Sequence, residues 1–128
     1  VDCGIDVERL SVRGRSMAIA EKMFAFSEQQ ALKRLPGGAF QARFFDYWTL
    51  REAYCKALGV GIANAGKYYC FVEQEPGQWE IRFDAASKDA SRHWQLTTMR
   101  PTEEHVMALA IRTAGMADRS IIHEFVVP

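Results

Sequence analysis

Apolar and polar residues alternate along the first stretch of the chain. Ile5 and Val7 fall on one side of an extended segment, and Asp6 and Glu8 fall on the other. A period of two residues is typical of a β-strand, so the sequence predicts a strand over residues 2–8. Because residues two apart share a face of a strand, we expect the two carboxylates to converge.

The segment that follows has a helical pattern of apolar residues. A first helix is predicted over residues 16–24. A second begins with Ser27 as its N-cap and Gln30 as the capping-box partner, and it runs to about residue 35. The Pro-Gly-Gly sequence after it is expected to break the helix.

A long helix is predicted over residues 41–58 and ends at Gly59, a good C-cap. Its apolar residues cover more than half of its circumference: Phe44, Tyr47, Trp48, Leu50, Ala53, Tyr54, Cys55, Ala57 and Leu58. Thr49, Glu52 and Lys56 share a narrow strip on the remaining side. Such an apolar helix is central, so its polar strip faces either solvent or a cleft.

From about residue 67 the period returns to two, which indicates strands. The predicted strands are 68–74, 79–83, 93–100, 105–112 and 120–127, with the first four joined in two hairpins. Helices therefore come first and an antiparallel meander follows, with one early strand. This order predicts a single α+β domain over residues 1–128, in which an antiparallel sheet packs against a long central helix.

Composition narrows the function classes. Apolar residues make up 48% and charged residues 25%, as in globular proteins. Sixteen basic and sixteen acidic side chains cancel, so no overall field recruits nucleic acid or an anionic membrane. No apolar run reaches the ~20 residues of a membrane span. The three cysteines, odd in number and in apolar contexts, indicate reduced thiols and a cytoplasmic protein.

Asp6 and Glu8 are candidate metal ligands. Two converging carboxylates repel each other unless a cation or hydrogen bonds compensate, and oxygen ligands suit Mg²⁺. On the pair alone, ordinary acids on an exposed strand face are the favoured interpretation.

Glu52 and Lys56 are the second candidate pair. A glutamate four residues before a lysine commonly stabilises helices, and that reading stays open. Their place on a mostly apolar helix favours a site instead. Arg51, which falls inside the apolar arc, is expected to extend out of it towards an anion. The three histidines, His93, His105 and His123, have no metal-ligand spacing, and we expect them to be structural.

Two segments taken together resemble the signature motifs of the 4′-phosphopantetheinyl transferases. They are Gly4-Ile-Asp-Val-Glu8 and Trp48-Thr-Leu-Arg-Glu-Ala-Tyr-Cys-Lys56, the latter followed by Ala57-Leu-Gly-Val-Gly-Ile62. The form of the second motif is similar to that of the larger, surfactin-synthetase-activating branch. The resemblance spans residues 3–62 and continues loosely through 105–112.

The resemblance implies a reaction and roles for residues. The phosphopantetheine arm of coenzyme A would pass to a serine of an apo acyl or peptidyl carrier protein, giving holo carrier and 3′,5′-ADP. Asp6, Glu8 and Glu52 would hold Mg²⁺ against the pyrophosphate. Lys56, helped by Arg51, would neutralise phosphate charge, and Glu52 or a metal-bound water would deprotonate the serine.

The resemblance also bears on completeness. Relatives of the larger branch have two similar halves with coenzyme A between them, and this chain is similar to the second half. The chain also starts abruptly at Val1, so we expect an N-terminal lobe in the same protein. A short, homotrimeric holo-acyl-carrier-protein synthase is one alternative. A catalytically silent coenzyme A-binding or scaffolding half-domain and a Mg²⁺-dependent phosphohydrolase are the others.

Carrier proteins of this kind are acidic around the modified serine, so the chain should have a locally basic contact surface. The candidates are Arg9, Arg13, Arg15 and Lys22.

Overall fold

A computed structural model of the chain describes residues 2–11, 16–62, 68–85 and 89–113. The elements in chain order are β1 (Cys3–Arg9), α1 (Ser16–Met23), α2 (Phe26–Lys33), α3 (Gly37–Leu58), β2 (Tyr69–Glu75), β3 (Gln78–Phe83), the 3₁₀ turn η2 (Ser91–His93), β4 (Trp94–Thr102) and β5 (His105–Arg112). The predicted α+β class is therefore confirmed. The predicted strand at 120–127 lies outside the described residues.

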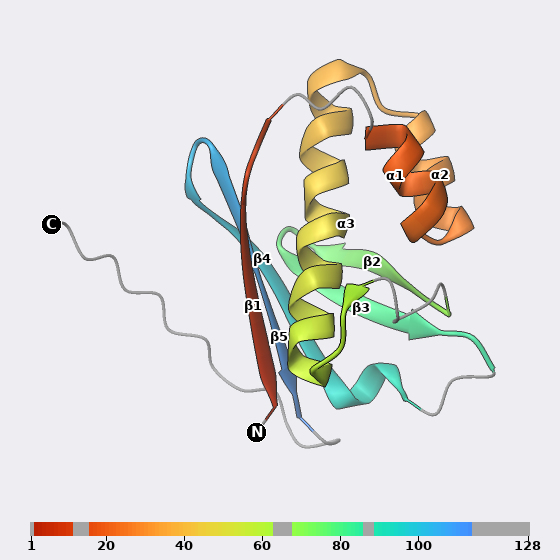
Figure 1. The fold of residues 1–128 in the computed structure, drawn as a ribbon, viewed down its shortest axis with the longest axis vertical. Helices are drawn as coiled ribbons and strands as arrows, with labels where there is room; N and C mark the ends of the chain where they lie inside the picture. Colours follow the sequence, from red (N-terminus) through yellow and green to blue (C-terminus); the bar gives the residue numbers. More distant parts are fainter. Residues whose placement is uncertain (1, 12–15, 63–67, 86–88, 114–128) are drawn as a thin grey trace, which may run out of the picture.

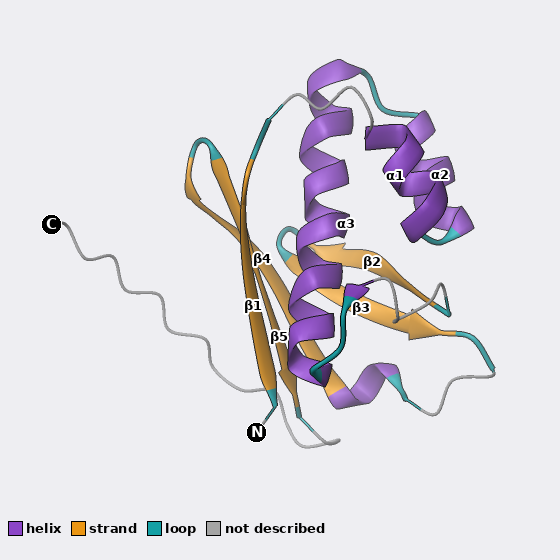
Figure 2. Cartoon of the chain, viewed as in Figure 1, coloured by secondary structure: helices purple, strands orange, loops and turns teal. Residues whose placement is uncertain are grey.

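The strands form one antiparallel sheet in the order β1-β5-β4-β3-β2. The first strand thus lies at one edge beside the last described strand. Helix α3 lies lengthwise along β1 and runs in the opposite direction, while α1 and α2 lie on the other side of α3 (Figure 1). Figure 2 shows this arrangement of helices and strands, with α3 crossing in front of the sheet.

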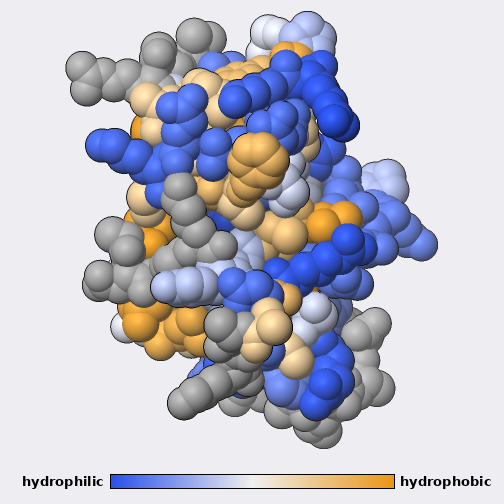
Figure 3. Space-filling view, turned by 90° about the vertical axis from the view of Figure 1, so that its right-hand side faces the viewer, coloured by the Kyte–Doolittle hydropathy of each residue, from blue (hydrophilic) through white to orange (hydrophobic). Residues whose placement is uncertain are grey.

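The core joins α3 to the sheet and to the segments around α1 and α2. Its most completely buried apolar side chains are Phe24, Leu32, Phe44, Phe45, Leu50, Ile81, Leu96 and Val106. Each such side chain stabilises the fold by about 1.5–3 kcal/mol relative to exposure. On the side of the molecule that carries α1 and α2, hydrophilic and hydrophobic residues are interspersed over the surface (Figure 3).

Two predicted helix starts were wrong. Helix α3 begins at Gly37 rather than near residue 41, because Pro36 is extended and acts as its N-cap (φ −79°, ψ 153°). Helix α2 begins at Phe26, after Ala25, and Ser27 lies inside its first turn. There the Glu28 carboxylate, rather than a serine hydroxyl, accepts a hydrogen bond from the Ala25 backbone N–H at 2.9 Å. The end of α3 was predicted correctly: Gly59 has a left-handed conformation (φ 76°).

Candidate active site

The site begins with the close approach of β1 to α3. Gly4 lies so near the helix that a Cβ atom there would be 1.9 Å from the Ala53 carbonyl oxygen. The absence of a side chain lets the strand pack against the helix backbone. As predicted from the alternation, Ile5 and Val7 share the opposite face of β1, where they are 52% and 50% exposed. Asp6 consequently points into the α3 interface.

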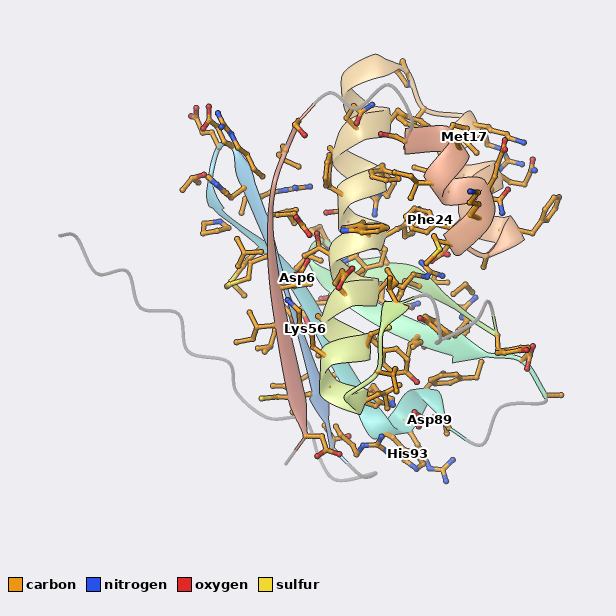
Figure 4. All side chains as sticks on the ribbon, in the orientation of Figure 1. Asp6, Met17, Phe24, Lys56, Asp89 and His93 are labelled. Carbon is orange, nitrogen blue, oxygen red and sulfur yellow. The ribbon has the colours of Figure 1, made fainter. Side chains whose placement is uncertain are left out.

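Asp6 and Lys56 meet across this interface. The Lys56 Nζ donates to Asp6 Oδ1 at 2.8 Å, and the two side chains point towards each other (Figure 4). The Asp6 side chain is only 7% exposed, whereas that of Lys56 is 52% exposed. The hydrogen bond to Asp6 is the main cause that raises the pKa of Lys56. Among the described residues, the buried Asp6 Oδ2 atom has no hydrogen-bond partner.

Glu52 lies one turn before Lys56 on the same side of α3 and is half-buried. Burial raises the pKa of its carboxyl above the ordinary value, and the nearby Asp6 charge raises it further, while Lys56 lowers it. Glu52 therefore lies within the electrostatic field of the Asp6–Lys56 pair. The two predicted motifs do come together in space.

Glu8 lies further along β1, and its carboxylate accepts a hydrogen bond from the Trp48 indole. The distance from Trp48 Nε1 to Glu8 Oε1 is 3.1 Å. Over the part of the chain that the structure describes, no group of three or more His, Cys, Asp or Glu side chains is arranged to hold a metal ion. Asp6, Glu8 and Glu52 thus border one face without forming a closed ligand set.

The donor chemistry nevertheless fits Mg²⁺. The acids supply only oxygen ligands, which this cation prefers. The unpartnered and buried Asp6 Oδ2 is the kind of atom that a cation or an ordered water satisfies. The metal ligands therefore remain a prediction that the residues present can support.

The expectation for Arg51 was wrong. Its side chain is 1% exposed and does not extend towards an outer anion. The guanidinium pairs with Glu28, also 1% exposed, at 2.6 Å, and it lies over the rings of Phe24, Tyr69 and Phe71. The sequence correctly placed Arg51 in the apolar arc of α3. Its partner Glu28 comes from α2, and no local sequence pattern indicates that pairing.

The Glu28–Arg51 pair also borders the outer edge of β2. Glu28 Oε2 accepts from the Phe71 backbone N–H at 3.0 Å, and Arg51 Nη2 donates to the Tyr69 carbonyl at 3.4 Å. These side chains take hydrogen-bonding positions that a further strand would otherwise fill. The pair is structural and anchors α3 to α2 and to the sheet edge.

A second polar cluster lies at the C-terminal end of α3, around Asp89 (Figure 4). Asp89 Oδ2 accepts from Tyr54 Oη at 3.1 Å and from Trp94 Nε1 at 2.8 Å. His93 Nδ1 lies 3.3 Å from Asp89 Oδ1. Sequence reasoning missed this cluster, because Asp89, His93 and Trp94 are close in the chain but form no recognisable motif, and Tyr54 lies 35 residues before Asp89. Its hydrogen bonds join η2 and β4 to α3, so His93 has the structural setting that was expected.

The expected basic contact surface is described only in part. Arg9 is well exposed, with its guanidinium 3.5 Å from the Glu104 carboxylate. Lys22 is exposed on α1. Arg13 and Arg15 lie outside the described residues, so the surface stays a prediction.

A cavity of about 370 Å³ lies away from the Asp6–Lys56 pair, between α2, α3 and the strands β2 and β3. Ser27, Glu28, Arg43, Tyr47, Glu73 and Trp79 are among its lining residues. Its buried carboxylate, Glu28, is already fully engaged, and we assign the cavity no chemistry. No helix among the described residues is long and apolar enough to cross a membrane.

Comparisons with known proteins point to one family. The sequence model of the 4′-phosphopantetheinyl transferase superfamily matches residues 2–110. The 4′-phosphopantetheinyl transferase HetI of Nostoc sp. is 32% identical over 113 residues, which are 88% of this chain and 44% of HetI. The 4′-phosphopantetheinyl transferase psf-1 of Bacillus pumilus is 34% identical over 79 residues, which are 62% of this chain and 33% of psf-1. The chain thus spans less than half the length of these curated relatives.

Solved structures share the fold at lower identity. A holo-(acyl-carrier-protein) synthase from Bacillus anthracis, in complex with CoA (3′,5′-ADP), has a TM-score of 0.64 and 19% identity, and the match covers 86% of this chain and 93% of that one. A holo-[acyl-carrier-protein] synthase from Neisseria meningitidis has a TM-score of 0.60 and 20% identity, with coverage of 87% and 96%. Both matches show a common fold for the domain.

Proposed function

Since the chain belongs to the 4′-phosphopantetheinyl transferase superfamily, we propose that its protein transfers phosphopantetheine from coenzyme A to a serine of an apo carrier protein. The products are the holo carrier protein and 3′,5′-ADP. The observation that carries the proposal is the contact between the two motifs: Asp6 of the first lies 2.8 Å from Lys56 of the second. Mg²⁺ and the surfactin-synthetase-activating branch are finer parts of the same proposal.

In the proposed site, Asp6, Glu8 and Glu52 would hold Mg²⁺. The ion would supply positive charge that offsets the negative charge of the pyrophosphate. Lys56 supplies a second positive charge. The Lys56 side chain is half-exposed although its ammonium group is paired with Asp6. It can therefore contact an anionic ligand that approaches from solvent, and α3 stays intact.

Glu52 is our candidate for the general base. A metal-bound water that Glu52 orients is the other candidate, and the half-buried Glu52 carboxylate lies on the same side of α3 as Lys56. In the proposed step the serine oxygen forms a bond to the phosphorus of the pantetheine phosphate, and the bond to the bridging oxygen of the pyrophosphate breaks. The serine proton passes to Glu52 and the electron pair leaves with 3′,5′-ADP.

We also propose that a second lobe completes the coenzyme A site. The chain spans 44% of HetI and 33% of psf-1. The outer face of β1 exposes Ile5 and Val7, and an apolar patch on that face would suit an interface. An N-terminal lobe of the same protein is the arrangement we favour, and a homotrimer of short chains is the alternative, since the match covers 93% of the Bacillus anthracis chain.

The experiment is direct. The complete protein is incubated with coenzyme A, Mg²⁺ and an apo carrier protein, and the carrier is weighed by mass spectrometry. We expect a mass gain equal to one phosphopantetheine arm, loss of the gain in Asp6→Asn, and no gain without a divalent cation. Coenzyme A binding without a mass gain would instead identify a silent half-domain, and release of phosphate without the carrier would indicate a phosphohydrolase.

A further inference from the structure

Thr49 is a buried polar residue that the proposed chemistry does not yet use. Its side chain lies in α3 and is 0% exposed. The Oγ1 atom has no hydrogen-bond partner among the described residues. Buried hydroxyls are nearly always paired, so an unpaired one calls for a specific explanation.

The position of Thr49 relative to Asp6 follows from the contacts on either side. Gly4 packs against Ala53 and Ala57, whereas Glu8 accepts a hydrogen bond from Trp48. Because β1 and α3 run in opposite directions, Asp6 faces the helical turn between these two contacts.

Thr49 is in that turn. It also shares one face of α3 with the two proposed site residues Glu52 and Lys56, which are three and seven positions further on. Its hydroxyl is thus on the side of α3 that meets the acids of β1.

The two unpaired atoms are chemically complementary. A threonine hydroxyl has one hydrogen to donate, and Asp6 Oδ2 is an acceptor that is also buried and without a partner. The other oxygen of Asp6 is already bound to Lys56. A helical threonine can instead bond to the carbonyl four residues earlier, but no such bond is present for Thr49.

We propose that Thr49 is a positioning residue of this site. Its hydroxyl donates through one bound water to Asp6 Oδ2, since no direct bond joins the two atoms, and so fixes the rotation of the carboxylate. The fixed carboxylate then keeps Oδ1 on Lys56 and holds the second lone pair of Oδ2 for a divalent cation. This inference rests on the proposed function, because it assigns Thr49 to the same metal and phosphate site.

The test compares Thr49→Val with Thr49→Ser in the complete protein. Valine keeps the shape of threonine without the hydroxyl, and serine keeps the hydroxyl. Mn²⁺ affinity is measured from the electron paramagnetic resonance signal of the free ion. We expect valine to weaken Mn²⁺ binding about tenfold or more, the usual effect of removing an outer-shell partner, and serine to stay within about twofold of wild type. Valine should lower kcat and leave the KM for the carrier protein unchanged.

The control is Thr97→Val, at a buried threonine on β4, which should leave Mn²⁺ affinity unchanged. The melting temperature of Thr49→Val, compared with that of Thr97→Val, checks that a loss of Mn²⁺ affinity does not come from unfolding. If valine does not fold, Thr49→Ala compared with Thr49→Ser gives the same contrast.

Wild-type Mn²⁺ affinity in Thr49→Val would overturn the inference. If Asp6→Asn also left Mn²⁺ binding unchanged, the metal site of the proposed function would fail as well. If Mn²⁺ binding is weakened in Asp6→Asn but not in Thr49→Val, only the proposed role of Thr49 is refuted.

Discussion

Replacing Glu28 by glutamine should strongly destabilise the domain. The change keeps the shape of the side chain but removes the counter-ion of Arg51, which lies 2.6 Å away with both side chains 1% exposed. A buried charge that loses its partner costs about 3–5 kcal/mol. Since small domains unfold with a free energy of about 5–15 kcal/mol, this loss is a large part of the total.

The other contacts of Glu28 explain why the loss of stability should lie at the upper end of this range. Its Oε1 also accepts from the Ala25 N–H at 2.9 Å, and its Oε2 accepts from the Phe71 N–H at 3.0 Å. A glutamine can retain only one of these two acceptor positions, because its amide nitrogen donates. The change therefore weakens the start of α2 and the edge of β2 together.

Urea unfolding followed by circular dichroism measures this loss, with Glu104→Gln as the matched control. Glu104 pairs with Arg9 at 3.5 Å, but both side chains are about two-thirds exposed (66% and 69%). Breaking such a surface pair should cost only about 0–1 kcal/mol. A loss below about 1 kcal/mol for Glu28→Gln would refute the view that the buried pair anchors α3. The double change Glu28→Met with Arg51→Met should recover much of the stability, because no charge then remains buried.

Further predictions concern the site, the pH dependence and the exposed face. Lys56→Ala should weaken coenzyme A binding by about 1.5–3 kcal/mol in calorimetric titration; a change of a few tenths would limit Lys56 to its pairing role. Burial raises the pKa of Asp46 from 3.8 to about 6, so the folded state holds this proton more tightly than the unfolded state. The free energy of unfolding should therefore fall by up to ~3 kcal/mol from pH 4 to pH 7, relative to Asp46→Asn. Residues 1–128 expressed alone should self-associate, and Ile5→Thr with Val7→Thr should reduce association in sedimentation; an unchanged monomer would contradict an apolar interface there.

Local patterns were enough to predict the architecture. The alternation of Ile5 and Val7 with acids identified β1, because the period of a strand is a property of the backbone. Gly59 identified the end of α3, because few other residues adopt a left-handed conformation without strain. The start of α3 was missed because the Pro-Gly-Gly sequence was read only as a helix breaker. Proline is also well suited to the first positions of a helix.

Helix and strand periodicity could predict which site residues share a face of one element, but not which elements pack together. Spacing alone put Glu52 and Lys56 on one strip of α3, and the structure adds Asp6 opposite them. Spacing could not show that Arg51 is buried, because its partner Glu28 is 23 residues away in the chain. Nor could spacing show that the apolar side of β1 faces outwards. That depends on which side of the strand α3 occupies.

The close packing at Gly4 makes the arrangement of the proposed site depend on a residue without any reactive atom. An alanine there would place a carbon 1.9 Å from the Ala53 carbonyl and 2.6 Å from the Ala57 backbone nitrogen, so the strand would have to move away from the helix. Asp6 would move with it and leave Lys56. A mutational scan scored only by activity would therefore rank Gly4 with the catalytic acids, although it takes no part in chemistry. For the same reason, the site cannot be grafted onto another scaffold by copying its charged side chains: the strand and the helix have to be transferred as one unit, with their spacing intact.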